Sequence, residues 1–253
     1  MIISERHHLI VLHCRKAAGS SLCVSLARLL GPADLQISAL AETMALGIPL
    51  SSRVRHIAER QSRGLLPLFR LLGPRFHHRA FSRAVDHAHR PLLGRKPPHA
   101  PAARVAAAFP REWASFRKLA VVRNPWDKTV SDYYWRIQRL RTPPSFATYV
   151  EALAAGHDLG GIVPLAFHDN WPMYTINDRV VADRVVRFEQ LQQDIETFFR
   201  DAGLDWDGWL PRSKGGHRPA GAPGGYRSHY TPELESLIGR LYSNEIDQFG
   251  YLF

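Results

Sequence analysis

Short apolar runs alternate along the chain with stretches in which apolar residues recur at helical spacing. Residues 9–12 (Leu-Ile-Val-Leu) and 119–122 (Leu-Ala-Val-Val) are apolar and partly β-branched, which predicts buried strands, and a third strand is predicted over 180–188. After each of these predicted strands, apolar residues recur at helical spacing. The three predicted helices cover 22–30, about 125 to 139, and 190–199. Strand and helix in alternation predict an α/β fold: a three-layer sandwich with a central, mostly parallel sheet flanked by helices.

The middle of the chain has a different pattern. From about 37 to 109 it alternates between helical and irregular stretches, because glycines and prolines such as Gly64, Pro67 and Gly73 interrupt the helical spacing. At the other end, Thr231 followed by Pro232 marks the start of a last helix. The pattern predicts a single domain over 1–253 with a helical insertion at about 37–100.

Composition excludes several classes of protein. The 253 residues are 45% hydrophobic and 22% charged, as in ordinary folded domains. Two cysteines, Cys14 and Cys23, are too few for a disulfide framework or a cysteine zinc site. No apolar run approaches the roughly 18 residues that a membrane span needs, so we expect a soluble, cytoplasmic protein.

The positive charge is concentrated in one segment. Lys and Arg number 33 against 23 Asp and Glu, a formal net charge of +10, yet residues 51–111 alone hold thirteen cations and only two acids, Glu59 and Asp86. Such a field attracts an anionic partner, whether a nucleotide, an acidic glycan, a nucleic acid or a phospholipid surface.

The first candidate site follows the first predicted strand. Lys16 precedes Gly19, Ser20 and Ser21 at the predicted start of a helix, where unpaired amides and the helix dipole favour an anion. The order of residues differs from a Walker A loop, in which the lysine follows the glycine. The second candidate site follows the strand at 119–122, where Arg123 and Ser131 flank a turn stiffened by Pro125 and suit a phosphate monoester.

Together the two loops resemble the sulfotransferases that use 3′-phosphoadenosine 5′-phosphosulfate (PAPS), in particular the carbohydrate-type branch. Residues 15–22 (Arg-Lys-Ala-Ala-Gly-Ser-Ser-Leu) are similar to the family's 5′-phosphosulfate loop Pro-Lys-x-x-Gly-Thr/Ser-Ser-Leu, with Arg15 where proline is usual. Residues 123–131 are similar to its 3′-phosphate motif. The resemblance implies a P-loop-like sandwich and a sulfuryl transfer that needs no metal.

Two further segments agree with the family, residues 186–191 and the ending 230–251. Four motifs in the same order bracket nearly the whole chain. Residues 37–99 and 156–177 carry no matching motif, so the resemblance implies nothing about the basic insertion.

The resemblance also implies a role for each matching residue. Lys16 would contact the oxygen that bridges phosphate and sulfate and neutralise charge on the leaving nucleotide, adenosine 3′,5′-bisphosphate. Arg123 and Ser131 would hold the 3′-phosphate, and Lys214 would contact the nucleotide from a basic glycine-rich segment. The residues expected to bind the 5′-phosphosulfate are Arg15, Lys16, Ala18, Gly19, Ser20, Ser21 and Leu22.

A general base is needed to accept the proton of an acceptor hydroxyl. In the family a His or Glu between the two loops has this role, and His99 is the best match here, with Glu112 as the carboxylate alternative. Four other histidines lie in the same span: His77, His78, His87 and His89. Their spacing, without nearby carboxylates or thiolates, does not suit a zinc site.

Other functions remain open at this point. A P-loop-like kinase would explain Lys16 and Ser20 but not the missing Walker A glycines. A non-catalytic binder of nucleic acid or anionic lipid would use the basic segment but leave both loops unexplained. We expect a sulfotransferase with a glycan or glycoconjugate acceptor, anionic or neutral, and no nucleic-acid partner. A small-molecule or lipid hydroxyl is the alternative acceptor.

Overall fold

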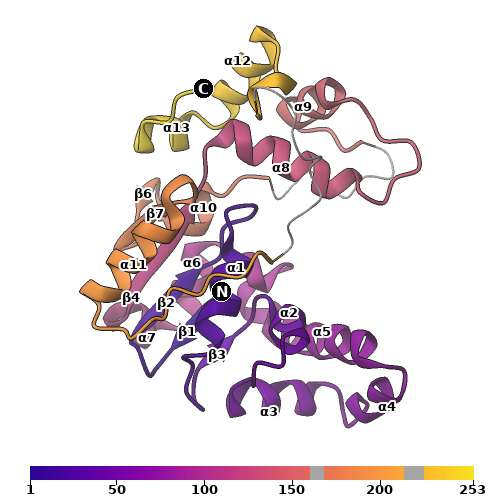
Figure 1. The fold of residues 1–253 in the computed structure, drawn as a ribbon, viewed down its shortest axis with the longest axis vertical. Helices are drawn as coiled ribbons and strands as arrows, with labels where there is room; N and C mark the ends of the chain where they lie inside the picture. The colour runs from indigo at the N-terminus through magenta and orange to yellow at the C-terminus, as the bar shows by residue number, and fades with distance from the viewer. Residues whose placement is uncertain (160–167, 214–224) are drawn as a thin grey trace. The chain divides into compact units, whose positions relative to one another are not determined.

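The structure, a computed structural model, describes residues 1–159, 168–213 and 225–253 (Figure 1). The chain divides into two units, Met1–Val121 with Pro172–Ser213 and Val122–Trp171 with Lys214–Phe253. A single functional domain over 1–253 with an insertion stays a prediction. Among the described residues, no helix is both long enough and apolar enough to cross a membrane.

The first unit is built on a five-stranded sheet in the order β3-β1-β2-β4-β7 (Figure 1). Its strands are β1 (Ile2–Ser4), β2 (Leu9–Leu12), β3 (Leu35–Gln36), β4 (Arg117–Val122) and β7 (Arg184–Arg187). β2 and β4 are parallel, with Leu9 opposite Arg117, whereas β1 is antiparallel to both β2 and β3. The α/β class is confirmed, but the sheet is mixed rather than mostly parallel, because a connection as short as residues 5–8 joins β1 to β2 only in the antiparallel sense.

The predicted strands agree with the structure where they are fully buried. All four residues of β2 are buried, as are the last four of β4. The strand predicted over 180–188 is divided: β6 (Arg179–Val180) forms a hairpin with β5 (Thr175–Ile176), and β7 joins the sheet separately. β1 and β3 were not predicted, because two or three residues show no periodicity.

The first unit also contains the helices that lie between and after these strands in the sequence. They are α1 (Gly19–Ala27), α2 (Leu40–Ala45), α3 (Ser52–Gln61), α4 (Leu66–Leu71), α5 (Pro74–Leu93), η1 (Pro97–His99), α6 (Ala102–Ala108), α7 (Pro110–Ser115), η3 (Phe188–Gln190) and α11 (Leu191–Asp201). The predicted insertion therefore contains α2 to α5 and η1, and α5 packs against α2, α3 and α4. Pro91 lies in the last turn of α5, where its missing N–H removes one helical hydrogen bond, the one to the His87 carbonyl oxygen.

The second unit is helical in the part described. It contains α8 (Pro125–Ile137), α9 (Phe146–Ala155), η4 (Arg227–His229), α12 (Pro232–Leu241) and α13 (Ser243–Phe249), and the short α10 (Trp171–Tyr174) follows at its boundary. α12 packs on α8 and α9. The predicted last helix is divided at Tyr242 into α12 and α13.

His89 couples the stability of the insertion to pH. It is buried on α5, its Nδ1 donates to the Val85 carbonyl oxygen (2.8 Å), and burial lowers the pKa of the imidazole. A lowered pKa in the folded state means that the unfolded chain binds a proton at His89 more readily than the folded chain does. The contribution of His89 to folding stability is therefore complete above about pH 6.5 and is lost as the pH falls below it. We expect the free energy of unfolding to decrease from pH 7 to pH 5, and His89→Gln to flatten that decrease. Urea denaturation at several pH values measures it, with exposed His56→Gln as the control; an unchanged slope in His89→Gln would contradict the assignment.

Candidate functional site

The loop between β2 and α1 has an unusual backbone. Lys16 and Ala18 both have left-handed conformations, with φ of 57° and 56°, although neither is glycine. Each such residue costs about 1–2 kcal/mol, so the surrounding packing must hold it. Left-handed residues that alternate with Ala17 turn successive backbone N–H groups toward one side, which is how backbone nests bind anions.

The start of α1 adds further donors. Ala18 is the N-cap and has no side chain with which to cap the helix. The backbone N–H of Leu22 donates to the Ala18 carbonyl oxygen (3.1 Å), so this amide is used within the helix, and the Leu22 side chain is buried. The first-turn amides of Gly19, Ser20 and Ser21 precede the first helical hydrogen bond and stand at the positive end of the helix dipole.

Gly19 is required here by close packing. A Cβ atom at this position would lie 2.0 Å from Cδ2 and 2.5 Å from Nε2 of His13, and the His13 ring is itself buried. The imidazole thus occupies the space that any larger residue would need. The strand end and the helix start are therefore locked together by one contact.

His99 lies beside the same loop. Its Nδ1 is 2.9 Å from the His13 carbonyl oxygen, and the two rings have centroids 4.5 Å apart. Because a carbonyl only accepts, Nδ1 carries a proton, and in the neutral ring Nε2 then has the lone pair that a general base needs. The fold thus brings together His99 and the Lys16 loop, which are far apart in the sequence.

The other histidines and the carboxylate alternative lie elsewhere in the first unit. His77 and His78 line a pocket among α3, α4 and α5, and His87 contacts Gln61 on α3. Glu112 lies on α7.

A pocket of about 550 Å³ adjoins the loop within the first unit. Ala18 and Ser21 line it, together with residues 188–193 and 210–212. The segment that includes residue 212 crosses α1: Ser213 donates its N–H to Ser21 Oγ (3.1 Å), and Trp206 Nε1 donates to Ser25 Oγ (2.8 Å). The predicted motif at 186–191 therefore lies against the first loop.

The second loop begins where β4 ends, at Arg123. Asn124 is the N-cap of α8, and its side chain accepts from the N–H groups of Trp126 and Asp127. Arg123 donates through Nε (2.9 Å) and Nη2 (2.6 Å) to Asp127 Oδ2, and its side chain is only 12% exposed. An anion at this loop would share the guanidinium with Asp127, a partner that the sequence interpretation missed although the i,i+4 spacing indicates it.

Buried charges hold α8 in its unit. Lys128 pairs with Glu245 (3.0 Å) and its Nζ lies 3.8 Å from the centroid of the Tyr242 ring. Asp132 accepts from Arg136 (2.7 Å) and from the Tyr149 hydroxyl (3.0 Å). Burial, followed by the Asp132 charge, raises the pKa of Tyr149, which keeps the phenol protonated as the donor.

Ser131 lies on the same helix and is half-buried. Arg123 lies in the connection between β4 and α8, just before the N-cap Asn124, so the two predicted 3′-phosphate residues come from a loop and from the helix that follows it. The C-terminal segment packs against this loop: Asn124 Nδ2 donates to the Leu252 carbonyl oxygen (2.9 Å), and Tyr230 donates its hydroxyl to the Trp126 carbonyl oxygen (2.8 Å). The motif at 230–251 thus supports the second loop.

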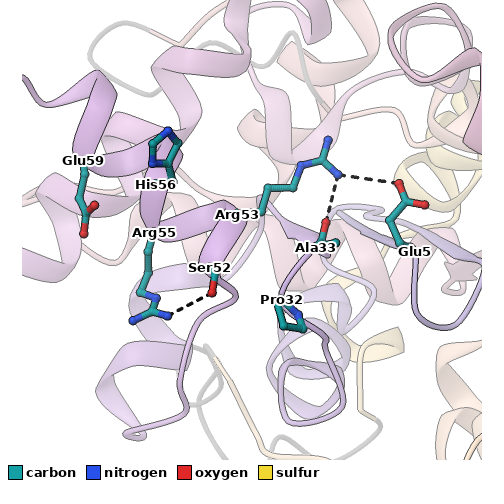
Figure 2. Close-up of a pocket in the computed structure, with 8 residues that line it drawn as sticks. All are labelled: Glu5, Pro32, Ala33, Ser52, Arg53, Arg55, His56 and Glu59. Atoms are coloured by element: carbon teal, nitrogen blue, oxygen red, sulfur yellow. Dashed lines mark hydrogen bonds and ion pairs between the residues drawn. The ribbon is translucent and has the colours of Figure 1, made fainter.

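A further pocket, of about 1,020 Å³, lies on the first unit, and its lining includes no residue of either loop (Figure 2). Its arginines already have partners in the protein. Arg53 contacts the Ala33 carbonyl oxygen and Glu5, and Arg55 contacts Ser52 (Figure 2). Its lining also includes the carboxylate of Glu59, which would repel an anion.

The predicted site residues thus fall into three groups. The first unit holds Arg15, Lys16, Ala18, Gly19, Ser20, Ser21, Leu22 and His99. The second holds Arg123 and Ser131, and Lys214 lies outside the described residues. Within the described ranges, no three His, Cys, Asp or Glu side chains gather as metal ligands would.

The His13–Gly19 contact gives a direct prediction. Gly19→Ala removes a helix glycine, which by propensity alone would stabilise α1 by up to about 1 kcal/mol. We expect destabilisation by about 1–3 kcal/mol instead, because the new methyl group collides with His13, and partial recovery in the His13→Ala/Gly19→Ala double variant. Thermal and urea unfolding measure both. Gly239→Ala on α12, where a Cβ would meet only Trp126 at 3.7 Å, is the control and should be neutral or stabilising; a stable Gly19→Ala would contradict the packing argument.

Comparison of the chain with protein-family models, curated proteins and solved structures gives no match. The functional interpretation therefore depends on the two loops, on His99 and on the family resemblance of the motifs.

Proposed function

We propose that the protein is a sulfotransferase that moves a sulfuryl group from PAPS to a hydroxyl of a glycan or glycoconjugate. The observation that carries the proposal is the loop from His13 to Ser21, in which left-handed residues and first-turn amides form an anion cradle with a lysine and an oriented imidazole beside it. This combination provides both a place for a phosphosulfate and the groups that its transfer requires.

The donor residues of the loop fit a phosphosulfate group. Gly19 leaves room for the His13 ring against the loop, and the hydroxyls of Ser20 and Ser21 add donors in a largely buried setting. PAPS would supply the activated sulfuryl group. Lys16 would neutralise the charge on the leaving nucleotide, which is the main electrostatic demand in a loose group transfer.

His99 would complete the chemistry as general base. Its Nδ1–H is committed to the His13 carbonyl oxygen, so Nε2 accepts the proton of the acceptor hydroxyl while the hydrogen bond holds the ring in orientation. Arg123 and Ser131 would bind the 3′-phosphate, and Asp127 would then compete for the arginine and keep it positioned when no anion is bound.

We propose four further features of the protein together with this activity. They are a P-loop-like arrangement of the sheet and its helices, a metal-free reaction, a role for Lys214 at the nucleotide and a cytoplasmic location. A nucleotide kinase is the competing function, and the choice of nucleotide separates the two.

Nucleotide binding is the first test. Adenosine 3′,5′-bisphosphate should raise the melting temperature of the protein in a concentration-dependent manner, whereas ATP with Mg²⁺ should not. Arg123→Ala should weaken bisphosphate binding about tenfold or more, because a charge-assisted contact to phosphate is lost. Arg139→Ala, an exposed arginine that follows α8, is the matched control. A preference for ATP would favour the kinase.

The transfer step is the second test. Lys16→Ala should lower the rate of sulfate transfer from radiolabelled PAPS to an acceptor glycan about a hundredfold or more, as loss of a transition-state donor does. His99→Gln should also lower the rate of transfer. It should abolish the fall of that rate at low pH, which reports a base that must be deprotonated, and it should leave the affinity for the bisphosphate unchanged. Arg117→Ala, at the amino end of β4, controls for general effects of losing a cation. Full activity in both Lys16→Ala and His99→Gln would refute the assignment.

A further inference from the structure

Helix α4 and its flanks carry large apolar side chains on the side facing solvent. Within residues 63–76, Leu66 alone is buried. Six others, which we call the apolar tip, are exposed by between 37% and 85%: Leu65, Leu68, Phe69, Leu71, Leu72 and Phe76. A surface helix of a soluble domain normally has the opposite arrangement, with its apolar residues facing the core.

The apolar side chains cover most of the outer circumference of the helix. Leu65 and Leu72, which flank α4, keep right-handed helical angles, so one helical pattern runs through both. Successive residues of a helix are turned by about 100° around its axis. The apolar positions therefore cover an arc of about 200°, which begins at Pro67, ends at Phe69 and is centred opposite Leu66. This surface is an apolar projection, unlike the narrow stripe by which a helix fits into the groove of another protein.

Arginines surround the apolar tip without any acidic residue among them. Residues 60–85 contain six Arg and no Asp or Glu. All six are exposed, and in the described part of the chain none of them pairs with a carboxylate: Arg60, Arg63, Arg70, Arg75, Arg79 and Arg83. The surface therefore presents both apolar area and a strong positive charge.

A pocket behind the tip offers room for an anionic headgroup. It measures about 780 Å³ among α3, α4 and α5, and Arg55, Arg70, His77 and His78 line it, with Glu59 as the one carboxylate in the lining. Leu66 and Phe81 form part of its apolar wall. The arginines of this pocket are complementary to an anionic lipid headgroup, and its apolar wall is complementary to the beginning of the acyl chains.

We propose that the apolar tip docks the protein on the surface of an anionic lipid bilayer, an interaction separate from the proposed sulfuryl transfer. At the bilayer interface the leucines would enter the boundary between headgroups and acyl chains while the arginines contact lipid phosphates. A nucleic acid would satisfy the arginines but leave the leucines in water. A second copy of this surface would bring like charges together.

Vesicle flotation of the full chain tests the proposal. The protein should float with phosphatidylcholine vesicles that contain phosphatidylserine and bind pure phosphatidylcholine at least about tenfold more weakly, with binding reduced by salt. The triple variant Leu68→Ser/Leu71→Ser/Leu72→Ser should lose about tenfold or more in affinity. Arg70→Gln/Arg75→Gln should lose about fivefold for each arginine. Because these side chains are exposed, circular dichroism should show the fold unchanged.

Leu252→Ser provides the matched control, since this leucine is 81% exposed in the second unit and lies outside the tip. It should bind vesicles as the unchanged protein does. Three results would overturn the proposal: no binding to the anionic vesicles, full binding by the triple-serine variant, or a solution dimer that light scattering shows to be abolished by the same triple substitution. Oligonucleotide binding that ignores the leucine substitutions, with no vesicle binding, would indicate a nucleic-acid surface instead.

Discussion

The contact between the His13 imidazole and the Cα of Gly19 is the constraint on which the first loop depends. It allows the chain to pass from β2 to α1 in six residues, with two non-glycine residues held in left-handed conformations. The buried Cys14 and Ala17 side chains anchor the same turn. Because the carbonyl group of His13 also orients His99, one residue sets both the direction of the amides and the tautomer of the imidazole.

The second loop is held by a different kind of interaction. There the N-cap of Asn124 and the buried pairs Lys128–Glu245 and Asp132–Arg136 fix α8. Removing one partner of such a pair leaves an uncompensated buried charge, which costs about 3–5 kcal/mol. A helix fixed in this way carries Ser131 and also Asp127, the partner of Arg123, whereas the first loop relies on backbone strain and close packing.

The large positive charge of the chain does not reside in these loops. The segment 51–111, which contains α3 to α6, holds the surplus, while the proposed donor loops supply a few cations such as Lys16 and Arg123. The charge near α4 lies beside exposed leucines on the surface, whereas the proposed phosphate site is a largely buried loop. From net charge alone, the Lys16 loop and the surface around α4 would be assigned to the same ligand. The structure distinguishes them, because the first is a loop with left-handed backbone and the second is an exposed surface with apolar and cationic side chains.

Much of the local structure follows from the sequence. The uniformly apolar runs 9–12 and 119–122 become buried strands, and Thr231 caps α12 by accepting from Leu234 N–H, because burial and capping are local properties of a few residues. Residues 15–22 and 123–131 resemble phosphate-binding motifs through residue type and spacing alone, and phosphate binding there stays a prediction.

Only the tertiary structure decided the rest. The five-stranded sheet became mixed through β1 and β3, whose few residues carry no periodic signal. His99 meets His13 across 86 positions, and nothing local to either residue specifies that distance. The leucines of α4 have the composition of a core helix, yet only Leu66 is buried, because burial depends on which side of the helix α5 packs against. Sequence periodicity thus specifies which residues can be buried, and the packing of distant segments determines which of them are.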